Sequence, residues 1–355
     1  MKSEEIARLA GVSRSTVSRV INNYPNVPAK TREKVMKIIR EYHYEPNLSA
    51  RVLAGKRTNT IGLFLFSIYD IKSPYRIYGN AYFSPFVDAF VDIGNSMGYY
   101  MLVHTVCKPG DCWRIRQTFS QKRIDGGIII TTDESREIES ILSDISHPVV
   151  IMDYSPSQIE KTINPKARIG VFNFNDEKGV NSVVDHLVSL GHRRIGMIMG
   201  RQTSYSGRRR RECFVKRLAH HGLPVDDRYM IKGDFTWETV VPEIEKLIFS
   251  HQLPTAIVAS NDAMAIAAIE TFRRHGMRIP EDISITGYDD SPASAIVKPS
   301  LTTVQIPFFE MAKRSMDMLS ELIESDKPRI MVCNADVGFV IRESCCENLH
   351  EEVAV

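Results

Sequence analysis

The spacing of apolar residues changes near residue 60. Upstream of it, apolar side chains recur every third or fourth position in three segments, which is the spacing of one face of a helix. These stripes are Ile6, Leu9 and Ala10, then Val17, Val20 and Ile21, then Val35, Ile38, Ile39 and Tyr42. Gly11 suits a tight turn between the first two segments, and Ser13 is a good N-cap for the second. The pattern predicts a helix-turn-helix domain over residues 1–45.

Downstream of Thr60, short apolar runs alternate with amphipathic segments. The runs are TIGLFLF, YYMLVHT, DGGIIIT, PVVIMD, RIGVFNF, RIGMIM, TAIVAS and ISITGY. Apolar strands separated by helices are typical of parallel sheets that are covered on both faces. These runs are enough for two sheets, so residues 60–355 are predicted to form an α/β core of two lobes with a cleft between them.

The charge distribution singles out the N-terminal segment. Residues 1–60 hold twelve basic and five acidic side chains, a net charge of +7, whereas the whole chain carries +2. A basic head on an acidic body favours contact between the head and a polyanion. No apolar run reaches the ~18 residues of a membrane span, and the start MKSEEIARLA lacks the apolar core of a signal peptide. We therefore expect a cytoplasmic protein without a membrane partner.

The sequence carries no signal for an enzyme. No Gly-x-Gly-x-x-Gly turn follows the first apolar run, and no Gly-x-x-x-x-Gly-Lys phosphate loop occurs. The six cysteines include no Cys-x-x-Cys pair of the kind that binds metals, and no nucleophile stands out beside a base. We expect no enzymatic activity, no cofactor and no metal.

The second predicted helix has a polar face suited to DNA. Opposite its apolar stripe lie Arg14, Ser15, Ser18, Arg19 and Asn22. Arginine can make paired hydrogen bonds to guanine, and serine and asparagine can bond bases or phosphates. A merely solvated helix face would have the same composition, so on these residues alone the two interpretations stay open, with DNA reading favoured.

Longer motifs resemble the LacI/GalR (lactose-repressor) family of bacterial transcription regulators. In the head they are AGVSRSTVSRVINN, TREKV and PNLSARVLAGKRTNTIGL; in the body they are RIDGGIII, SLGHRRIGMI and AIVASNDAMAIAAIETFRRHGMRIPEDISITGYDDSPASAIVKPSLTTV. The resemblance implies a homodimer that binds a near-palindromic operator and responds to a small ligand in the cleft. It also implies a core like that of periplasmic sugar-binding proteins, built from two Rossmann-like lobes.

The same resemblance implies roles for residues of the head. Arg14, Ser15 and Arg19 would read bases, and Asn22 and Thr31 would touch the DNA backbone or nearby bases. Residues 46–59 would form a hinge helix and linker, with Leu53 as a wedge between base pairs in the minor groove. Many members have threonine at the position of Lys2 as the cap of the first helix, so here Ser3 is expected to be the cap.

The resemblance also sets the expected lobe boundaries. The N-lobe would span about 60–166 and 301–328, and the C-lobe about 167–300 and 329–345. The chain would therefore cross between the lobes near residues 165–169, 299–304 and 328–331.

Candidate ligand contacts lie at the ends of predicted strands, where ligands gather in open α/β sheets. Asn261 follows TAIVAS and Asp289 follows ISITGY, and both can bond sugar hydroxyls or ring nitrogens. Asp262 is assigned instead to capping the next helix. The resemblance adds Tyr82, Phe83, Gln202, Ser204, Arg208 and Phe235.

These assignments leave alternatives open. Each aromatic could be packed in the core instead of stacking on a ligand, and Arg209–Arg211 are assigned to a solvated helix face. The effector implied by the resemblance is a sugar or sugar derivative. A purine co-repressor is a second possibility, and a solute-binding receptor without DNA binding is a third.

Overall fold

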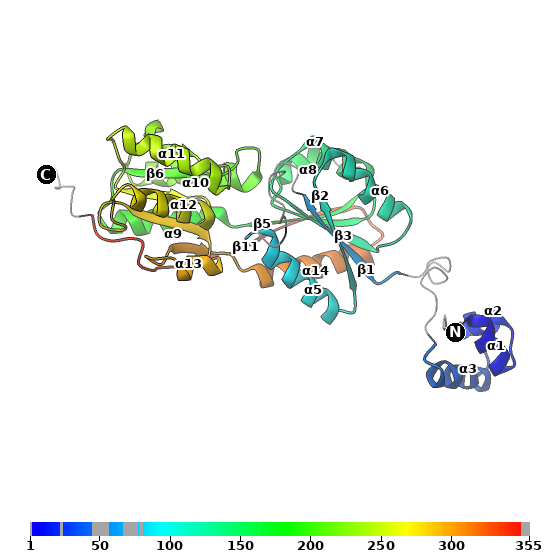
Figure 1. Cartoon of the computed structure of the whole chain (residues 1–355). Helices are drawn as coiled ribbons and strands as arrows, with labels where there is room; N and C mark the ends of the chain where they lie inside the picture. Colours follow the sequence, from blue (N-terminus) through cyan, green and yellow to red (C-terminus); the bar gives the residue numbers. More distant parts are fainter. Residues whose placement is uncertain are drawn as a thin grey trace. The chain divides into compact units, whose positions relative to one another are not determined.

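The structure is a computed structural model that describes residues 2–21, 24–44, 57–66, 77, 81–162 and 164–348. The chain divides into two compact units, Met1–Thr58 and Asn59–Val355 (Figure 1). Two predicted DNA contacts, Asn22 and Leu53, and most of the predicted hinge segment lie outside the described residues. Within those residues, no helix is both long enough and apolar enough to cross a membrane.

The first unit is a helix-turn-helix domain, as predicted. Its helices are α1 (Ser3–Ala10), α2 (Arg14–Ile21) and α3 (Ala29–Glu41). Gly11 ends α1 in the left-handed region at φ 62°, and the Ser13 hydroxyl accepts the Thr16 amide at 3.1 Å, which caps α2. The helices pack around one small core, made of Ile6, Ala7, Ala10, Val17, Val20, Val27, Val35 and Tyr44.

Three details of this unit correct the sequence-based expectation. Helix α1 already includes Ser3, and the Lys2 amide donates to the Glu5 carboxylate at 2.8 Å, so Ser3 is not the cap. Leu9 and Tyr42 are 42% and 46% exposed and do not belong to the core. The chain turns after α3, where the Tyr44 amide donates to the Ile39 carbonyl at 2.9 Å, and this turn brings Tyr44 onto the core in place of Tyr42.

The first lobe of the second unit is built on a parallel sheet. In the part of the chain that the structure describes, six strands pair in the order β11-β5-β4-β3-β1-β2. Their bounds are β1 (Thr60–Phe66), β2 (Tyr100–Val106), β3 (Gly126–Thr131), β4 (Pro148–Met152), β5 (Arg168–Phe174) and β11 (Arg329–Ala335). Helices α5 (Phe83–Ser96) and α14 (Phe308–Glu324) cover one face; α6 (Cys112–Ser120), α7 (Arg136–Asp144) and α8 (Pro156–Thr162) cover the other (Figure 1).

The second lobe repeats this arrangement. Among the described residues its sheet has the order β12-β10-β9-β8-β6-β7, in which only β12 runs antiparallel to its neighbour. The strands are β6 (Ile195–Met199), β7 (Met230–Lys232), β8 (Ala256–Ala259), β9 (Ser284–Asp289), β10 (Thr302–Gln305) and β12 (Gly338–Val340). Helices α9 (Asp176–Ser189) and α10 (Tyr205–His220) pack on one face; α11 (Trp237–Phe249) and α12 (Asp262–Arg274) pack on the other, and the short α13 (Pro292–Ile296) follows β9.

Burial on both faces explains why the strands are apolar throughout. Along β1, Leu63 and Leu65 point into the core under α5 and α14, whereas Phe64 and Phe66 point into the core on the opposite face. Successive side chains of a strand point to opposite faces, so a strand between two helical layers has no polar side.

The predicted lobe boundaries are wrong by one strand at each crossing. Strand β5 was assigned to the C-lobe but pairs with β4 of the first sheet, and β11, also assigned there, pairs with β5. Strand β10 was assigned to the N-lobe but pairs with β9 of the second sheet. The crossings therefore follow β5, β10 and β11, because each strand runs the full depth of its own sheet before the chain changes lobe.

Candidate functional site

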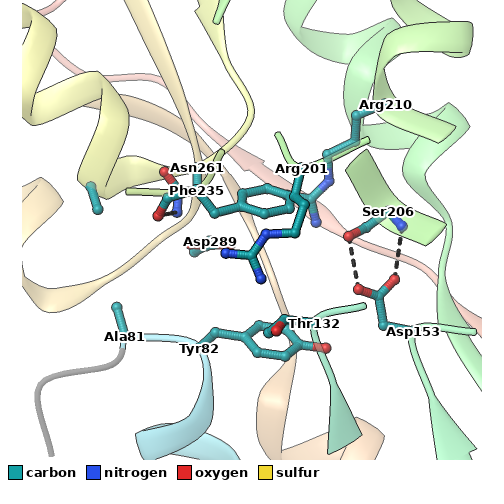
Figure 2. Close-up of a pocket in the computed structure, with 11 residues that line it drawn as sticks. Ala81, Tyr82, Thr132, Asp153, Arg201, Ser206, Arg210, Phe235, Asn261 and Asp289 are labelled. Carbon is teal, nitrogen blue, oxygen red and sulfur yellow. Dashed lines mark hydrogen bonds between the residues drawn. The ribbon is translucent and has the colours of Figure 1, made fainter. Parts of the chain in front are cut away.

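A cavity of about 130 Å³ lies between the two lobes of the second unit. It is lined by Ala81, Tyr82, Thr132, Asp153, Arg201, Ser206, Arg210, Phe235, Asn261, Ala263 and Asp289 (Figure 2). These residues stand in the segments that follow β1, β3 and β4 of the first lobe and β6, β7 and β8 of the second, and Asp289 is the last residue of β9. The carboxyl ends of the two sheets therefore face each other across the cavity, which is where ligands bind in this architecture.

Four predicted ligand contacts line this cavity: Tyr82, Phe235, Asn261 and Asp289. Phe235 stands on the second lobe, and its ring packs over Gly200, where a Cβ atom would lie only 2.2 Å from the ring. Tyr82 reaches the cavity from the start of α5 on the first lobe (Figure 2). An aromatic face is thus available from each lobe.

Four other predicted contacts do not line the cavity: Phe83, Gln202, Ser204 and Arg208. Phe83 is 1% exposed and packs in the core below α5, because neighbouring residues of a helix point in different directions. Ser204 is the N-cap of α10, where its hydroxyl accepts the Gly207 amide at 3.0 Å. Gln202 is exposed and donates its side-chain amide to the Gly200 carbonyl at 2.8 Å.

Arg210, rather than Arg208, supplies a cavity guanidinium from α10. The two residues are separated by about 200° around the helix, so Arg208 points to Glu134 at the rim while Arg210 points inward. The assignment of Arg210 to a solvated face was therefore wrong. The residue is buried, and its Nε donates to the Asp176 carboxylate at 2.8 Å.

Arg210 is held by a buried network. Its guanidinium lies 3.5 Å from the centre of the Tyr288 ring, and its Nη1 donates to the Ser260 carbonyl at 2.5 Å. The Tyr288 hydroxyl donates to Asp176 at 3.0 Å. Burial alone lowers the pKa of Arg210, but Asp176 and the other acidic groups around it raise that pKa above its ordinary value. The guanidinium is thus a fixed charge in a defined orientation.

Asp153 joins the lobes across the cavity. It follows β4 of the first lobe, and its carboxylate accepts the Ser206 amide at 2.9 Å and the Ser206 hydroxyl at 2.8 Å from α10 of the second (Figure 2). Burial, and then the negative charge of Asp176, raise the pKa of Asp153 from 3.8 to about 7. This carboxyl therefore titrates within the physiological range.

The remaining polar groups are also held in place. The Asn261 side chain caps α12 by accepting the Met264 amide at 2.9 Å, and it donates to the Phe235 carbonyl at 3.3 Å. Asp262 is not the cap, which corrects the prediction; its carboxylate accepts the Ser291 amide at 2.7 Å and the Thr303 hydroxyl at 2.6 Å. Burial, followed by the charge of Asp262, raises the pKa of Asp289 well above its ordinary value.

A second arginine of this cavity, Arg201, was not predicted from the sequence. It is buried, its Nε donates to Asp234 at 3.0 Å, and Figure 2 shows it extending from the second lobe toward Tyr82 of the first. Arg201 stands two residues after β6, and Asp153 directly follows β4. The strand-end rule that identified Asn261 and Asp289 would have identified both, had it been applied to every strand.

The polar face of α2, which the sequence predicts to contact DNA, is exposed. Arg14, Ser15, Ser18 and Arg19 are exposed along α2, and Thr31 on α3 is half-buried. Val17 and Val20, on the opposite side of α2, are in the core. Arg14 lies 3.4 Å from Glu4, but this ion pair is largely exposed and contributes little to stability.

Stability of the second unit is expected to fall as the pH rises from about 4 to about 7. In this window the folded protein keeps a proton on Asp153, whereas the unfolded chain, with the ordinary pKa of 3.8, has lost it. The slope from one such group is up to about 1.4 kcal/mol per pH unit. Urea denaturation measures the free energy of unfolding at pH 5 and at pH 7.5, and the difference between the two values should be smaller in Asp153→Asn than in the unsubstituted protein. An equal difference would contradict the proton assigned to Asp153.

Comparison with known proteins gives consistent results for both units. Residues 4–47 match the family described as bacterial regulatory proteins, lacI family, and residues 184–345 match the periplasmic binding protein-like domain. The HTH-type transcriptional repressor PurR of Photobacterium profundum is 31% identical over 346 residues, covering 96% of this chain and 97% of that protein.

Two solved structures cover the whole fold. The Lac repressor dimer bound to operator and the anti-inducer ONPF gives a TM-score of 0.77 at 28% identity, covering 98% of this chain and 99% of that one. The complex of the transcriptional regulator CelR with cellobiose gives a TM-score of 0.71 at 26% identity, with coverage of 97% and 99%.

Proposed function

This chain belongs to the lacI family of bacterial regulatory proteins, and we propose that it is a transcriptional repressor that binds a near-palindromic operator as a homodimer. A sugar or sugar derivative in the interlobe cavity would control it, and it would act on DNA in the cytoplasm. The observation that carries the proposal is that one chain holds both an exposed polar face on α2 and a strand-end cavity lined by aromatic and charged side chains. The PurR and CelR relatives are regulators, not enzymes, and the Lac repressor structure is a dimer on operator DNA.

On the DNA side, phosphate contacts would provide affinity and α2 would provide sequence choice. Arg14, Ser15, Ser18 and Arg19 are proposed to face base edges, because they share the exposed side of α2. Thr31 and Asn22 are proposed to touch the backbone or nearby bases. Leu53 is proposed to wedge between base pairs in the minor groove.

On the effector side, the charges favour a neutral ligand. Among the described residues at the cavity, the guanidiniums of Arg201 and Arg210 are already paired with Asp234 and Asp176. Burial raises the pKa of Asp153 and that of Asp289, so these carboxyls can hold protons and add no positive charge. A phosphorylated ligand would therefore meet, among the described cavity residues, only guanidiniums that are already paired. A sugar can instead exchange hydrogen bonds with the carboxyls through its hydroxyls and stack on Tyr82 or Phe235.

A purine is the second candidate. The repressor PurR is 31% identical to this chain over nearly its whole length. A flat base could stack on an aromatic face, and Asn261 and Asp289 could bond its ring nitrogens.

A thermal-shift screen of the full chain tests the effector class. Neutral mono- and disaccharides, their phosphates, and purine bases are the probes. A ligand at about 100 times its Kd stabilises the folded protein by about 2.7 kcal/mol. We expect the shift from a neutral sugar and none from its phosphate. A shift only with purines would favour the second candidate.

DNA binding is tested separately by selecting operators from a random duplex library with the full chain. Affinity for the selected DNA, measured by fluorescence anisotropy, should fall by about 10³- to 10⁵-fold between 50 and 200 mM salt. Sedimentation of the complex should give two protein chains per operator. A receptor without DNA binding would select no sequence and show no salt dependence.

A further inference from the structure

An ion pair joins the lobes outside the cavity lining. Arg208 on α10 of the second lobe contacts Glu134, which follows β3 in the first lobe. The Glu134 side chain is only 6% exposed, whereas that of Arg208 is 36% exposed. A carboxylate so far removed from water is costly unless it is paired and hydrogen-bonded. The pair therefore favours the arrangement in which the two lobes meet.

Both partners are tied to their surroundings. The Glu134 carboxylate also accepts the Ser155 amide at 2.6 Å, which links the loops after β3 and β4 of its own lobe. The Glu134 backbone amide donates across the lobes to the Thr203 carbonyl at 3.0 Å. Arg208 donates to the Gln202 carbonyl at 3.2 Å. The ion pair thus fastens the loop that precedes α10 to two loops of the first lobe.

This contact differs from the other interlobe bonds of the site. Asp153 and Ser206 line the cavity, so an effector can compete with or add to their hydrogen bonds. Glu134 and Arg208 do not line it, and they are remote in sequence from the three chain crossings after β5, β10 and β11. Their pairing can therefore hold the lobes together whether or not the cavity is filled.

We propose that Glu134 and Arg208 form a latch that keeps the lobes closed without touching the effector. The proposal rests on the proposed function in one respect, because it takes lobe closure as the regulated event. A ligand shifts a conformational equilibrium only by its differential affinity for the two states. The latch fixes the starting population of the closed state, and the apparent effector affinity scales with that population. Both residues act by positioning the lobes.

The test is hydrogen–deuterium exchange of the full chain without any ligand. The amide of Ser206 is the reporter, because its bond to Asp153 crosses the lobes but involves neither latch residue. Glu134→Gln keeps an acceptor for the Ser155 amide, and Arg208→Gln removes the guanidinium, which within its own lobe also donates to the Gln202 carbonyl. Each is expected to speed exchange at Ser206 about tenfold, through more frequent opening. The double variant should exchange no faster than either single variant, because each single substitution already breaks the same interlobe ion pair.

Arg209→Gln is the matched control. Arg209 lies next to Arg208 on α10, but its ion-pair partners Glu212 and Glu177, at 3.0 and 3.9 Å, both belong to the second lobe. Exchange at Ser206 should be unchanged in this variant. Arg208→Lys keeps the charge without the planar fork, and an intermediate rate is expected.

Unchanged exchange at Ser206 in both single variants would overturn the latch, as would fully additive effects in the double variant. Should Arg208→Gln fail to fold, the rates of Glu134→Gln and Arg208→Lys decide the question in the same way. None of these measurements involves DNA or a ligand. Failure of the proposed function would appear in the operator selection and the thermal-shift screen instead.

Discussion

Replacing Arg210 by methionine is expected to lower the free energy of unfolding of the second unit by about 3 to 5 kcal/mol, the usual cost of removing one partner from a buried ion pair. The substitution leaves the Asp176 carboxylate buried without its cation, and the Ser260 carbonyl loses a donor. It also removes the charged group that lies 3.5 Å from the Tyr288 ring centre. The same variant should bind the effector more weakly, because the cavity loses one of its oriented donors.

Urea denaturation at pH 7, followed by circular dichroism, measures this loss. Arg209→Met is the control, because Arg209 carries the same charge on the same helix in a half-exposed position, and we expect a change within about 0.5 kcal/mol. Combining Arg210→Met with Asp176→Asn should cost less than the sum of the two single changes, since the second removes the stranded charge. A loss below about 1 kcal/mol for Arg210→Met would show that the pair is not desolvated as described.

Much of the fold follows from residue spacing alone. The apolar stripes of α1, α2 and α3 and the apolar runs of β1, β3, β4 and β9 predict elements that the structure contains. The spacing of apolar residues indicates which side chains are buried, and this distinguishes helices buried along one stripe from strands buried on both faces. The spacing does not indicate which strands pair with each other. The sequence RIGVFNF reads the same whether β5 belongs to one sheet or the other, so the lobe boundaries were misplaced.

The site was predictable where position along a strand decides it, and unpredictable where rotation about a helix decides it. Asn261 and Asp289 stand at strand ends, and parallel packing brings those ends together. Arg208 and Arg210 belong to a run of four arginines, and identical residues do not indicate which of them faces the interior of the protein. Which one points inward depends on how α10 lies on its sheet, and only the structure supplies that orientation. The same holds for Tyr82 and Phe83.

The run of arginines also shows how context assigns different roles to one residue type. Arg210 is buried against Asp176, Arg208 bridges to the other lobe, and Arg209 pairs within its own lobe. Arginine keeps its charge in all three settings because its pKa is far above neutrality. What varies is the solvent around the partner carboxylate, and this decides whether the pair contributes to stability, to lobe closure or to neither.

Replacing Arg19 by alanine is expected to abolish most of the sequence preference of the proposed homodimer. A bidentate arginine contact to a base contributes about 1 to 3 kcal/mol of discrimination. Loss of that contact in two half-sites corresponds to a fall of roughly 30-fold to 20,000-fold in affinity for the selected operator. Binding to scrambled DNA should weaken far less, because only one charge per subunit is lost.

Anisotropy titrations with the selected operator and with a scrambled duplex, at one fixed salt concentration, measure the specific and the non-specific affinity. Arg40→Ala is the control, since Arg40 lies on α3 and its Nε donates to the Met36 carbonyl of its own helix. Removing this charge should change binding to the two duplexes by the same factor. If Arg19→Ala also weakens both duplexes equally, Arg19 contacts phosphate and not bases, and sequence choice must come from Arg14, Ser15 or Ser18 or from residues outside α2. The ratio of the two affinities, not either one alone, therefore decides the role of this helix face.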